Sequence, residues 1–291
     1  MDLEGILQSV FNFENYGELL VLVQNSLWAG AVLGLLGGLV GTFVMKRDLA
    51  FAVHGISELS FAGAAFALLI GADVVFGSLI GSVAAALLLG FMGVRARDKN
   101  SIIGVIMPFG LGLGILFLSL YEGRAANKFG LLTGQIVSVD TVQLQALAGT
   151  AMVVMAGLIA IWRPLSFASV DPELAEARGV PVRSLALAFM VLLGISVALS
   201  IQIVGALLVL ALLITPAAAA LRVTSSPRLV VVLSVVFAMV ATVGGILLAL
   251  GGRIPISPYV TTLSFLIYVV CRVIGSVRAK RGLNGRVLRT A

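Results

Sequence analysis

The sequence predicts an all-α fold, a polytopic transmembrane helical bundle of about nine spans, with eight as the alternative. The first observation is composition: 60% of the 291 residues are hydrophobic, 11% are charged, and the mean hydropathy is +1.15, which excludes a soluble globular protein. The second is that the apolar residues lie in blocks of about 20, the length that crosses a bilayer. The third is that only short loops remain between the blocks. Residues 1–291 are therefore expected to form a single membrane domain.

The segment 1–18 precedes the first span. All its charged residues are acidic, so it lacks the basic region of a cleaved signal peptide, and we expect it to be retained. Its apolar residues recur at near-helical spacing, as at Ile6, Val10 and Phe13. This pattern predicts an outer interfacial segment, a short amphipathic helix lying on the membrane surface.

The spans follow in order after this segment. We place them near residues 19–45, 51–71, 74–94, 102–120, 143–162, 185–201, 204–221, 229–250 and 257–274. Between residues 185 and 221, two short spans must turn around residues 200–205. The alternative for this region is a broken or re-entrant pair, which needs protein or water around its backbone.

Basic residues orient the bundle. With the N-terminus outside, all but three of the 19 Lys and Arg residues fall on the inner side, the exceptions being Arg124, Lys128 and Arg253. Because short cytoplasmic loops carry the excess of Lys and Arg, the C-terminus and its basic tail, 276–291, are predicted to be cytoplasmic. The net charge of +6 therefore reflects span ends, and we expect the tail to contact anionic membrane lipid, with no nucleic acid as a partner.

Glycines recur every four residues in two spans. The first span holds two such series, and the third span holds one: Gly30, Gly34 and Gly38; Gly37 and Gly41; Gly77 and Gly81. Small residues at this spacing let helix backbones approach closely inside a membrane. We expect tight packing within one subunit, and a contact between subunits is the alternative.

The second span carries an ionisable pair. His54 and Glu58 lie four residues apart, so they project from one helical face, and a rise of about 1.5 Å per residue from Arg47 puts Glu58 near the bilayer centre. A carboxylate there costs about 3 kcal/mol, so such residues usually face a cavity on a transport path. Imidazole nitrogen and carboxylate oxygen suit zinc, manganese or ferrous iron. The alternative is a structural pair whose members satisfy each other.

The other metal-binding residue types are scarce. The chain has a single histidine and a single cysteine, Cys271, which excludes an intramolecular disulfide and a multi-histidine zinc site within one copy.

The loop 163–183 between the fifth and sixth spans contains complete start and stop signals for a helix of about two turns. Asp171 is a helix N-cap and Pro172 suits the first helical position. Arg178 falls in the last turn and Gly179 is placed to end the helix. An isolated helix this short is marginal in water, so it should dock either on its own bundle or on a partner.

Several ordered motifs resemble one family, the integral-membrane permeases of bacterial metal-type ABC importers. The resemblance runs from about residue 26 to residue 275. Its motifs are the Lys46-Arg47 step, Glu-Leu-Ser-Phe-Ala at 58–62, Leu-Thr-Gly-Gln-Ile-Val-Ser-Val at 132–139, Asp-Pro-Glu-Leu-Ala at 171–175 with Arg-Gly-Val-Pro-Val at 178–182, Val-Gly-Ala-Leu-Leu-Val at 204–209 with Leu-Ile-Thr-Pro-Ala-Ala-Ala at 213–219, and the stretch from Pro255 to Pro258.

The resemblance implies a permease that forms a homodimer in the bacterial plasma membrane. Its cargo would be a divalent metal ion, without a permanently bound cofactor, delivered by an extracytoplasmic metal-binding protein. A cytoplasmic ABC ATPase would bind the loop helix, whose coupling residues are Asp171, Pro172, Glu173, Leu174, Ala175, Arg178 and Gly179. No Walker-type phosphate-binding motif occurs, so ATP must be hydrolysed by another chain, and this chain is not expected to be an enzyme.

The sequence departs from the commonest family pattern in the second span. Many members carry an aspartate and a histidine four residues apart, in Asp-Ala-Leu-Ser-His-Ala, where this chain has Ser57 and Phe61. His54 and Glu58 are then the candidate metal ligands from three residues earlier, and Gln135, where relatives often place an aspartate, is a weaker candidate. Further candidates for lining or gating the path are Ser57, Phe61, Gln202, Thr215 and Pro216.

Three other functions remain open at this point. A proton-coupled secondary transporter or channel could use His54 and Glu58 as a proton relay. An ABC permease could instead carry a bulky metal chelate such as a siderophore. A purely structural membrane scaffold would need neither residue for transport.

Overall fold

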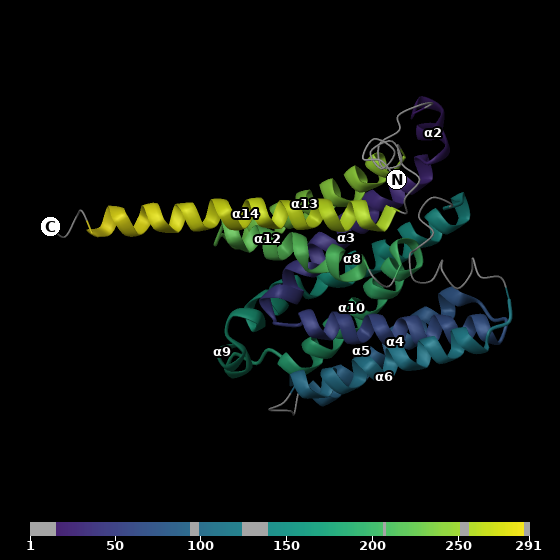
Figure 1. Cartoon of the computed structure of the whole chain (residues 1–291). Coiled ribbons are helices and arrows are strands. Elements are labelled where there is room, and N and C mark those ends of the chain that lie inside the picture. The colour runs from purple at the N-terminus through teal and green to yellow at the C-terminus, as the bar shows by residue number, and fades with distance from the viewer. Residues whose placement is uncertain (1–15, 94–98, 124–138, 206–207, 251–255, 288–291) are drawn as a thin grey trace.

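The computed structural model describes residues 16–93, 99–123, 139–205, 208–250 and 256–287 (Figure 1). Within these ranges the regular elements are helices, as the composition predicts. In chain order they are α2 (Tyr16–Leu22), α3 (Gln24–Lys46), α4 (Ala50–Leu69), α5 (Val74–Gly93), α6 (Lys99–Leu120), α8 (Thr141–Val170), α9 (Pro172–Ala177), α10 (Val182–Val204), α11 (Val209–Leu213), α12 (Thr215–Val223), α13 (Pro227–Ala249) and α14 (Ile256–Val287).

In the described part of the chain, eight helices are long and apolar enough to cross a membrane: α3, α4, α5, α6, α8, α10, α13 and α14. The seventh predicted span, 204–221, is instead two short helices, α11 and α12, that meet at Ile214. The break has a chemical cause, because Pro216 lacks a backbone N–H and its ring clashes with the carbonyl group four residues earlier, that of Leu212 in α11. The sixth predicted span is one continuous helix, α10, so of the region 185–221, for which a broken or re-entrant pair was the alternative, only the second part is interrupted. We call α11 and α12 the broken pair below.

The broken pair still carries the chain from one end of the bundle to the other. Arg278 Nη1 donates a hydrogen bond to the Val223 carbonyl oxygen at 3.3 Å, which ties the end of α12 to the C-terminal part of α14. Figure 1 shows that end of α14 on the same side of the bundle as α9, with α2 at the opposite end. The described N-terminal helix and the C-terminal end of α14 thus lie at opposite ends of the bundle.

The glycines of α3 pack two other helices onto two of its faces. A Cβ atom at Gly38 would lie 2.6 Å from the Val235 nitrogen of α13, and one at Gly37 would lie 2.9 Å from Leu212 of α11. Thr242 on α13 donates a hydrogen bond to the Gly30 carbonyl oxygen at 3.0 Å. The expectation of tight packing within one subunit is confirmed for this span.

Helices α4, α5 and α6 form a separate group of neighbours, seen below the α3, α12, α13 and α14 group in Figure 1. Gly63 of α4 meets the backbone of Gly77 and Gly81 of α5 directly. A buried hydrogen bond of 2.8 Å joins the hydroxyls of Ser60 and Ser78 across the same contact. The small residues let α4 approach α5 closely, which fixes the helix that carries the ionisable pair.

Several boundaries differ from those predicted. The outer interfacial segment, 1–18, lies mostly outside the described residues; its end belongs to α2, and the first long helix begins at Gln24 instead of residue 19. The fifth predicted span ends at residue 162, but α8 continues through Pro164 to Val170. Buried Leu165 and Ala168 carry the helix past the proline, so the expectation of a loop from residue 163 is wrong at its start. The basic tail, 276–291, begins inside α14, and its contact with lipid stays a prediction.

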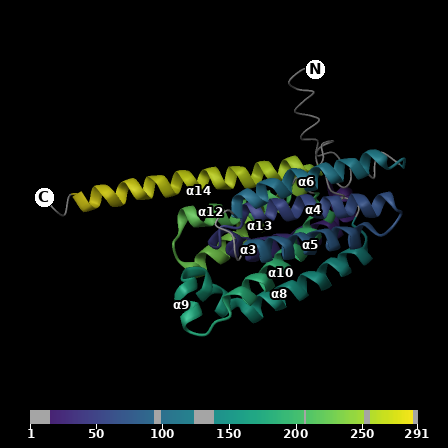
Figure 2. The same cartoon turned by 90° about the horizontal axis from the view of Figure 1, so that it is seen from below.

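Near α9, an aromatic cluster joins α3, α8 and α10. The ring of Phe43 meets Trp162 edge-on with centroids 4.8 Å apart, and it lies 5.9 Å from the ring of Phe189. Phe43 and Phe189 are fully buried. This cluster holds three long helices together near the end where α9 docks (Figure 2).

Candidate functional site

The ionisable pair lies in the first half of α4. His54 is the fifth residue of the helix and Glu58 the ninth, so both fall within the apolar span. The His54 Nε2 atom lies 3.8 Å from Glu58 Oε1, as the four-residue spacing predicts. The side chains are 34% and 13% exposed, which makes the pair accessible from one side of the helix.

The contact between the two side chains is too long to satisfy either of them. Hydrogen bonds between nitrogen and oxygen are normally 2.7–3.2 Å long. The other ring nitrogen of His54, Nδ1, is buried and has no hydrogen-bond partner within the described residues. This geometry argues against the alternative of a mutually satisfied structural pair, because buried polar atoms in such a pair would be hydrogen-bonded.

Glu58 is held in place by the close approach of α6. A Cβ atom at Gly110 would lie 3.1 Å from the Glu58 carbonyl carbon, so the two backbones touch at this level. Among the residues that the structure describes, no group of three or more His, Cys, Asp or Glu side chains gathers around a point. The pair therefore supplies one nitrogen and one oxygen donor, and water, backbone or a second copy would have to complete a coordination shell.

Ser57 and Phe61 lie on a different face of α4. Both are buried, and Phe61 packs with Ala65 and Leu118 in a small core between α4 and α6. Gly114 on α6 lies directly against the Phe61 ring. The resemblance aligns these two positions with the aspartate and histidine expected in this helix, and in this chain Phe61 is used for helix packing.

The remaining path candidates are spread over the chain. Thr215 and Pro216 begin α12 at the break of the broken pair, with Thr215 half-buried and Pro216 buried. Gln202 falls in the last turn of α10, and its side chain is not among those described. Gln135 lies outside the described residues.

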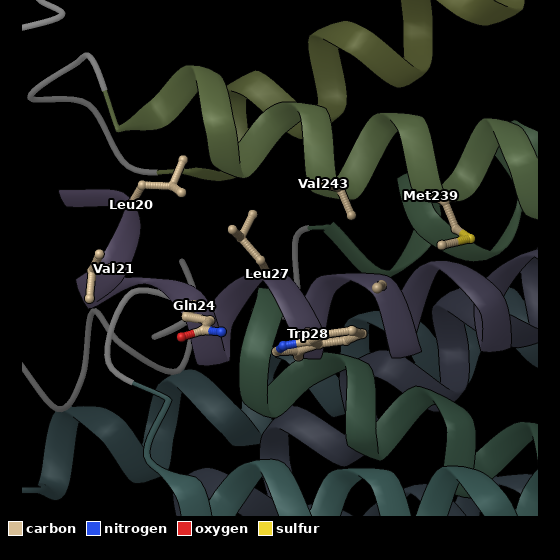
Figure 3. Close-up of a pocket in the computed structure, with 8 residues that line it drawn as sticks. Leu20, Val21, Gln24, Leu27, Trp28, Met239 and Val243 are labelled. Carbon is tan, nitrogen blue, oxygen red and sulfur yellow. The ribbon is translucent and has the colours of Figure 1, made fainter. Parts of the chain in front are cut away.

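An apolar groove lies between α2, α3 and α13, away from the pair (Figure 3). Its lining residues are Leu20, Val21, Gln24, Leu27, Trp28, Ala31, Met239 and Val243. Gln24 supplies its one amide, and no ionisable side chain lines it. A groove of this chemistry cannot replace the hydration shell of a bare cation, so it is not a metal site.

The predicted two-turn helix of the loop is α9, and its caps are as predicted. Asp171 Oδ1 accepts a hydrogen bond from the Leu174 backbone N–H at 2.9 Å, with Pro172 at the first helical position. Gly179 has a φ of 81°, the left-handed conformation that glycine adopts most easily. The Val180 and Gly179 N–H groups bond back to the carbonyls of Ala175 and Glu176, a Schellman motif that ends the helix.

The coupling residues divide between the bundle and the outside. Ala175 is fully buried where α9 packs on α8 and α10, whereas Leu174 is 46% exposed and Glu173 is exposed. Ala175 therefore anchors α9, and only its neighbours can meet a partner. Ser169, in the last turn of α8, was not predicted from the sequence; its hydroxyl accepts a hydrogen bond from Arg47. No motif signals this contact, because it joins residues far apart in the chain.

The described residues hold eight helices long and apolar enough to cross a membrane, a polar pair inside one of them and a capped helix docked at one end, the features of a polytopic membrane permease. The chain belongs to the ABC 3 transport family, whose sequence profile matches residues 20–275.

The relatives and a solved structure agree with this membership. The manganese transport system membrane protein MntC of Halalkalibacterium halodurans is 30% identical over 225 residues, 77% of each chain. The high-affinity zinc uptake system membrane protein ZnuB of Haemophilus influenzae is 25% identical over 246 residues, covering 84% of this chain and 94% of the relative. A chain of the structure of PsaBC from Streptococcus pneumoniae in complex with Fab superposes with a TM-score of 0.79 and 25% identity, over 88% of this chain and 94% of that one.

Proposed function

We propose that the chain is the translocating subunit of an ATP-driven importer for a divalent transition-metal ion, with manganese and zinc as the first candidates. The observation that carries the proposal is the His54–Glu58 pair, accessible and not hydrogen-bonded to each other, inside a span of an ABC 3 family permease. Nitrogen and oxygen donors suit both ions. Relatives named for manganese and for zinc transport support the same two ions as candidates.

A site with few ligands suits transport because a cargo ion must leave it again. The pair offers two donors from one chain, so exchange with water is easy compared with a closed four-ligand structural site. Its partial exposure places it where a second copy could supply further ligands. We therefore propose that the path runs beside or between two copies of the chain, with His54 and Glu58 reached alternately from each side.

ATP hydrolysis is proposed to take place on separate cytoplasmic ABC ATPase subunits that bind α9, because the sequence has no Walker-type motif. The exposed side chains of Glu173 and Leu174 offer the contact surface. The end of the bundle with α9 is then cytoplasmic, in the bacterial plasma membrane. At the opposite end an extracytoplasmic metal-binding protein would deliver the ion.

The test is uptake of manganese, zinc or ferrous iron into proteoliposomes that contain the permease, its ATPase and its binding protein. We expect uptake only with hydrolysable ATP, and no uptake from the permease alone. Uptake without the ATPase that follows an imposed proton gradient would contradict the proposal and favour a proton-coupled transporter. Uptake of a siderophore complex but of no free ion would instead indicate a chelate permease.

A further inference from the structure

The three-residue turn between α3 and α4 is tied to the end of α8 by one side chain. Arg47 caps the C-terminus of α3, and its Nη1 donates a hydrogen bond to Ser169 Oγ at 3.2 Å. Arg47 is half-buried, and no salt bridge of Arg47 is found among the described residues. Burial lowers the pKa of its guanidinium, as expected for a cation that lacks a carboxylate partner.

The acceptor, Ser169, is oriented toward the arginine. Its hydroxyl proton goes to the Leu165 carbonyl oxygen at 2.6 Å, one turn earlier in α8. A serine hydroxyl has one donor and two acceptor sites, so this bond leaves its lone pairs free for Arg47. Two residues later, Asp171 both ends α8 and caps α9, with no linker between the two helices. Ser169 therefore lies two residues from the joint at which a displacement of α9 reaches α8.

On the other side, Arg47 connects directly to the start of α4. The Leu49 N–H bonds to the Val44 carbonyl oxygen at 2.9 Å across Asp48, whose φ of 54° closes a tight left-handed turn. Helix α4 begins at Ala50, and His54 follows about one helical turn later. A displacement of the Arg47 head group thus acts on the first turn of the helix that carries the ionisable pair.

We propose that Arg47 and Ser169 form the connection that transmits movement of α9 to α4, which makes Arg47 a positioning residue for His54 and Glu58. This inference rests on the proposed function of α9 as the ATPase-binding element. The contact is not needed to hold α3 on α8, because the edge-on packing of Phe43 and Trp162 already joins these helices. Its loss should therefore affect transmission more than folding.

The test uses the complete transporter, permease with ATPase and binding protein, in proteoliposomes. The variants are Ser169→Ala, Arg47→Gln, the double variant and Arg47→Lys, and the quantity is the number of metal ions taken up per ATP hydrolysed. Manganese and zinc alone serve as separate probes. Lys46→Gln is the charge-matched control, since Lys46 lies over the Phe43 ring instead. Ser196→Ala is the serine control, because Ser196 bonds back to Leu192 within α10.

We expect the ratio to fall about fivefold in Ser169→Ala and in Arg47→Gln, with assembly and ATP hydrolysis kept. The double variant should match the single ones, because all three remove the same contact. Arg47→Lys should recover part of the ratio, and both controls should keep the wild-type value. Wild-type ratios in both single variants, or losses that multiply in the double variant, would overturn the proposal. If the Arg47→Gln complex fails to assemble, the ratio of metal taken up to ATP hydrolysed in Ser169→Ala alone tests the proposal.

A second measurement does not depend on the cargo. Spin labels on Phe51→Cys at the start of α4 and on Glu176→Cys on α9 report movement on nucleotide binding, since both side chains are exposed. In Ser169→Ala the α9 label should still respond and the α4 label should not. An unchanged α4 response refutes the connection. A wild-type complex that hydrolyses ATP without moving metal would instead refute the proposed function, and it is seen before any variant is compared.

Discussion

At the scale of single residues, Glu58 and His54 stand out because the fold exposes them without satisfying them. Several serines and threonines of the long helices bond back to their own helix, such as Ser196 and Thr150. In contrast, His54 Nε2 lies 3.8 Å from Glu58 Oε1, and His54 Nδ1 has no hydrogen-bond partner among the described residues. Their spacing predicted the juxtaposition. Their exposure could not be predicted, because it depends on how closely α6 approaches at Gly110.

The first prediction concerns the carboxylate. Glu58→Gln keeps the size of the side chain but removes its charge, so metal uptake should fall about tenfold or more, the usual effect of weakening a metal-binding shell. Glu122→Gln is the matched control, because Glu122 is an exposed acid at the end of α6. Growth under zinc, manganese or iron limitation measures the effect and identifies the ion. Full growth of Glu58→Gln under all three conditions would contradict a role of the pair in transport.

At the scale of elements, α9 shows how far capping rules reach. Asp171, Pro172 and Gly179 predicted both ends of the helix, since caps act locally. The sequence did not predict that Ala175 is buried and Leu174 exposed, because this difference depends on how α9 packs on α8 and α10. The fifth span was predicted to end at residue 162, but α8 continues through Pro164, because burial of the next turn of α8 outweighs one missing hydrogen bond.

The second prediction concerns the exposed side of α9. Leu174→Asp should abolish co-purification with the ATPase and leave the permease folded, because Leu174 is only half-covered by its own bundle. Val142→Asp, an exposed apolar position at the opposite end of α8, is the control and should keep the complex. Affinity purification followed by size-exclusion chromatography measures both. Retained ATPase in Leu174→Asp would mean that α9 is not the docking element.

The third prediction concerns helix packing. Gly38→Val should destabilise the bundle by about 1–3 kcal/mol, because its Cβ atom would lie 2.6 Å from the backbone of α13. Gly149→Ala on α8 should change stability little, since nothing lies within 4 Å of an added Cβ atom there. Thermal unfolding in detergent compares the two. Equal melting temperatures for Gly38→Val and the wild type would show that α13 moves aside freely.

At the scale of the whole molecule, the order of apolar blocks predicted the bundle almost completely, because span length is set by the bilayer. The exception is the seventh block, where composition alone does not distinguish one span from α11 and α12. Their arrangement depends on tertiary contacts: Gly37 and Gly41 of α3 lie against Leu212 and Leu213 at the break. The glycine series predicted a close contact between helices but not which helix is the partner.

The fourth prediction concerns the orientation of the bundle. A membrane-impermeant maleimide should label Glu122→Cys in intact cells and Glu176→Cys only after lysis, because the distribution of basic residues predicts that the α9 end is inside. Both native side chains are exposed, and the native Cys271 is buried, which keeps the background low. The reverse pattern of labelling would invert the bundle and contradict ATPase binding at α9.

Asp171 joins a short helix directly to a long one. It is the C-cap of α8 and the N-cap of α9, so the six-residue α9 follows without a linker on a 30-residue helix about 45 Å long. A displacement of α9 that α8 follows as one body would also move the other end of α8, at Thr141. The same movement of α9 would then act on two places, on Arg47 through Ser169 and on the opposite end of the bundle through α8.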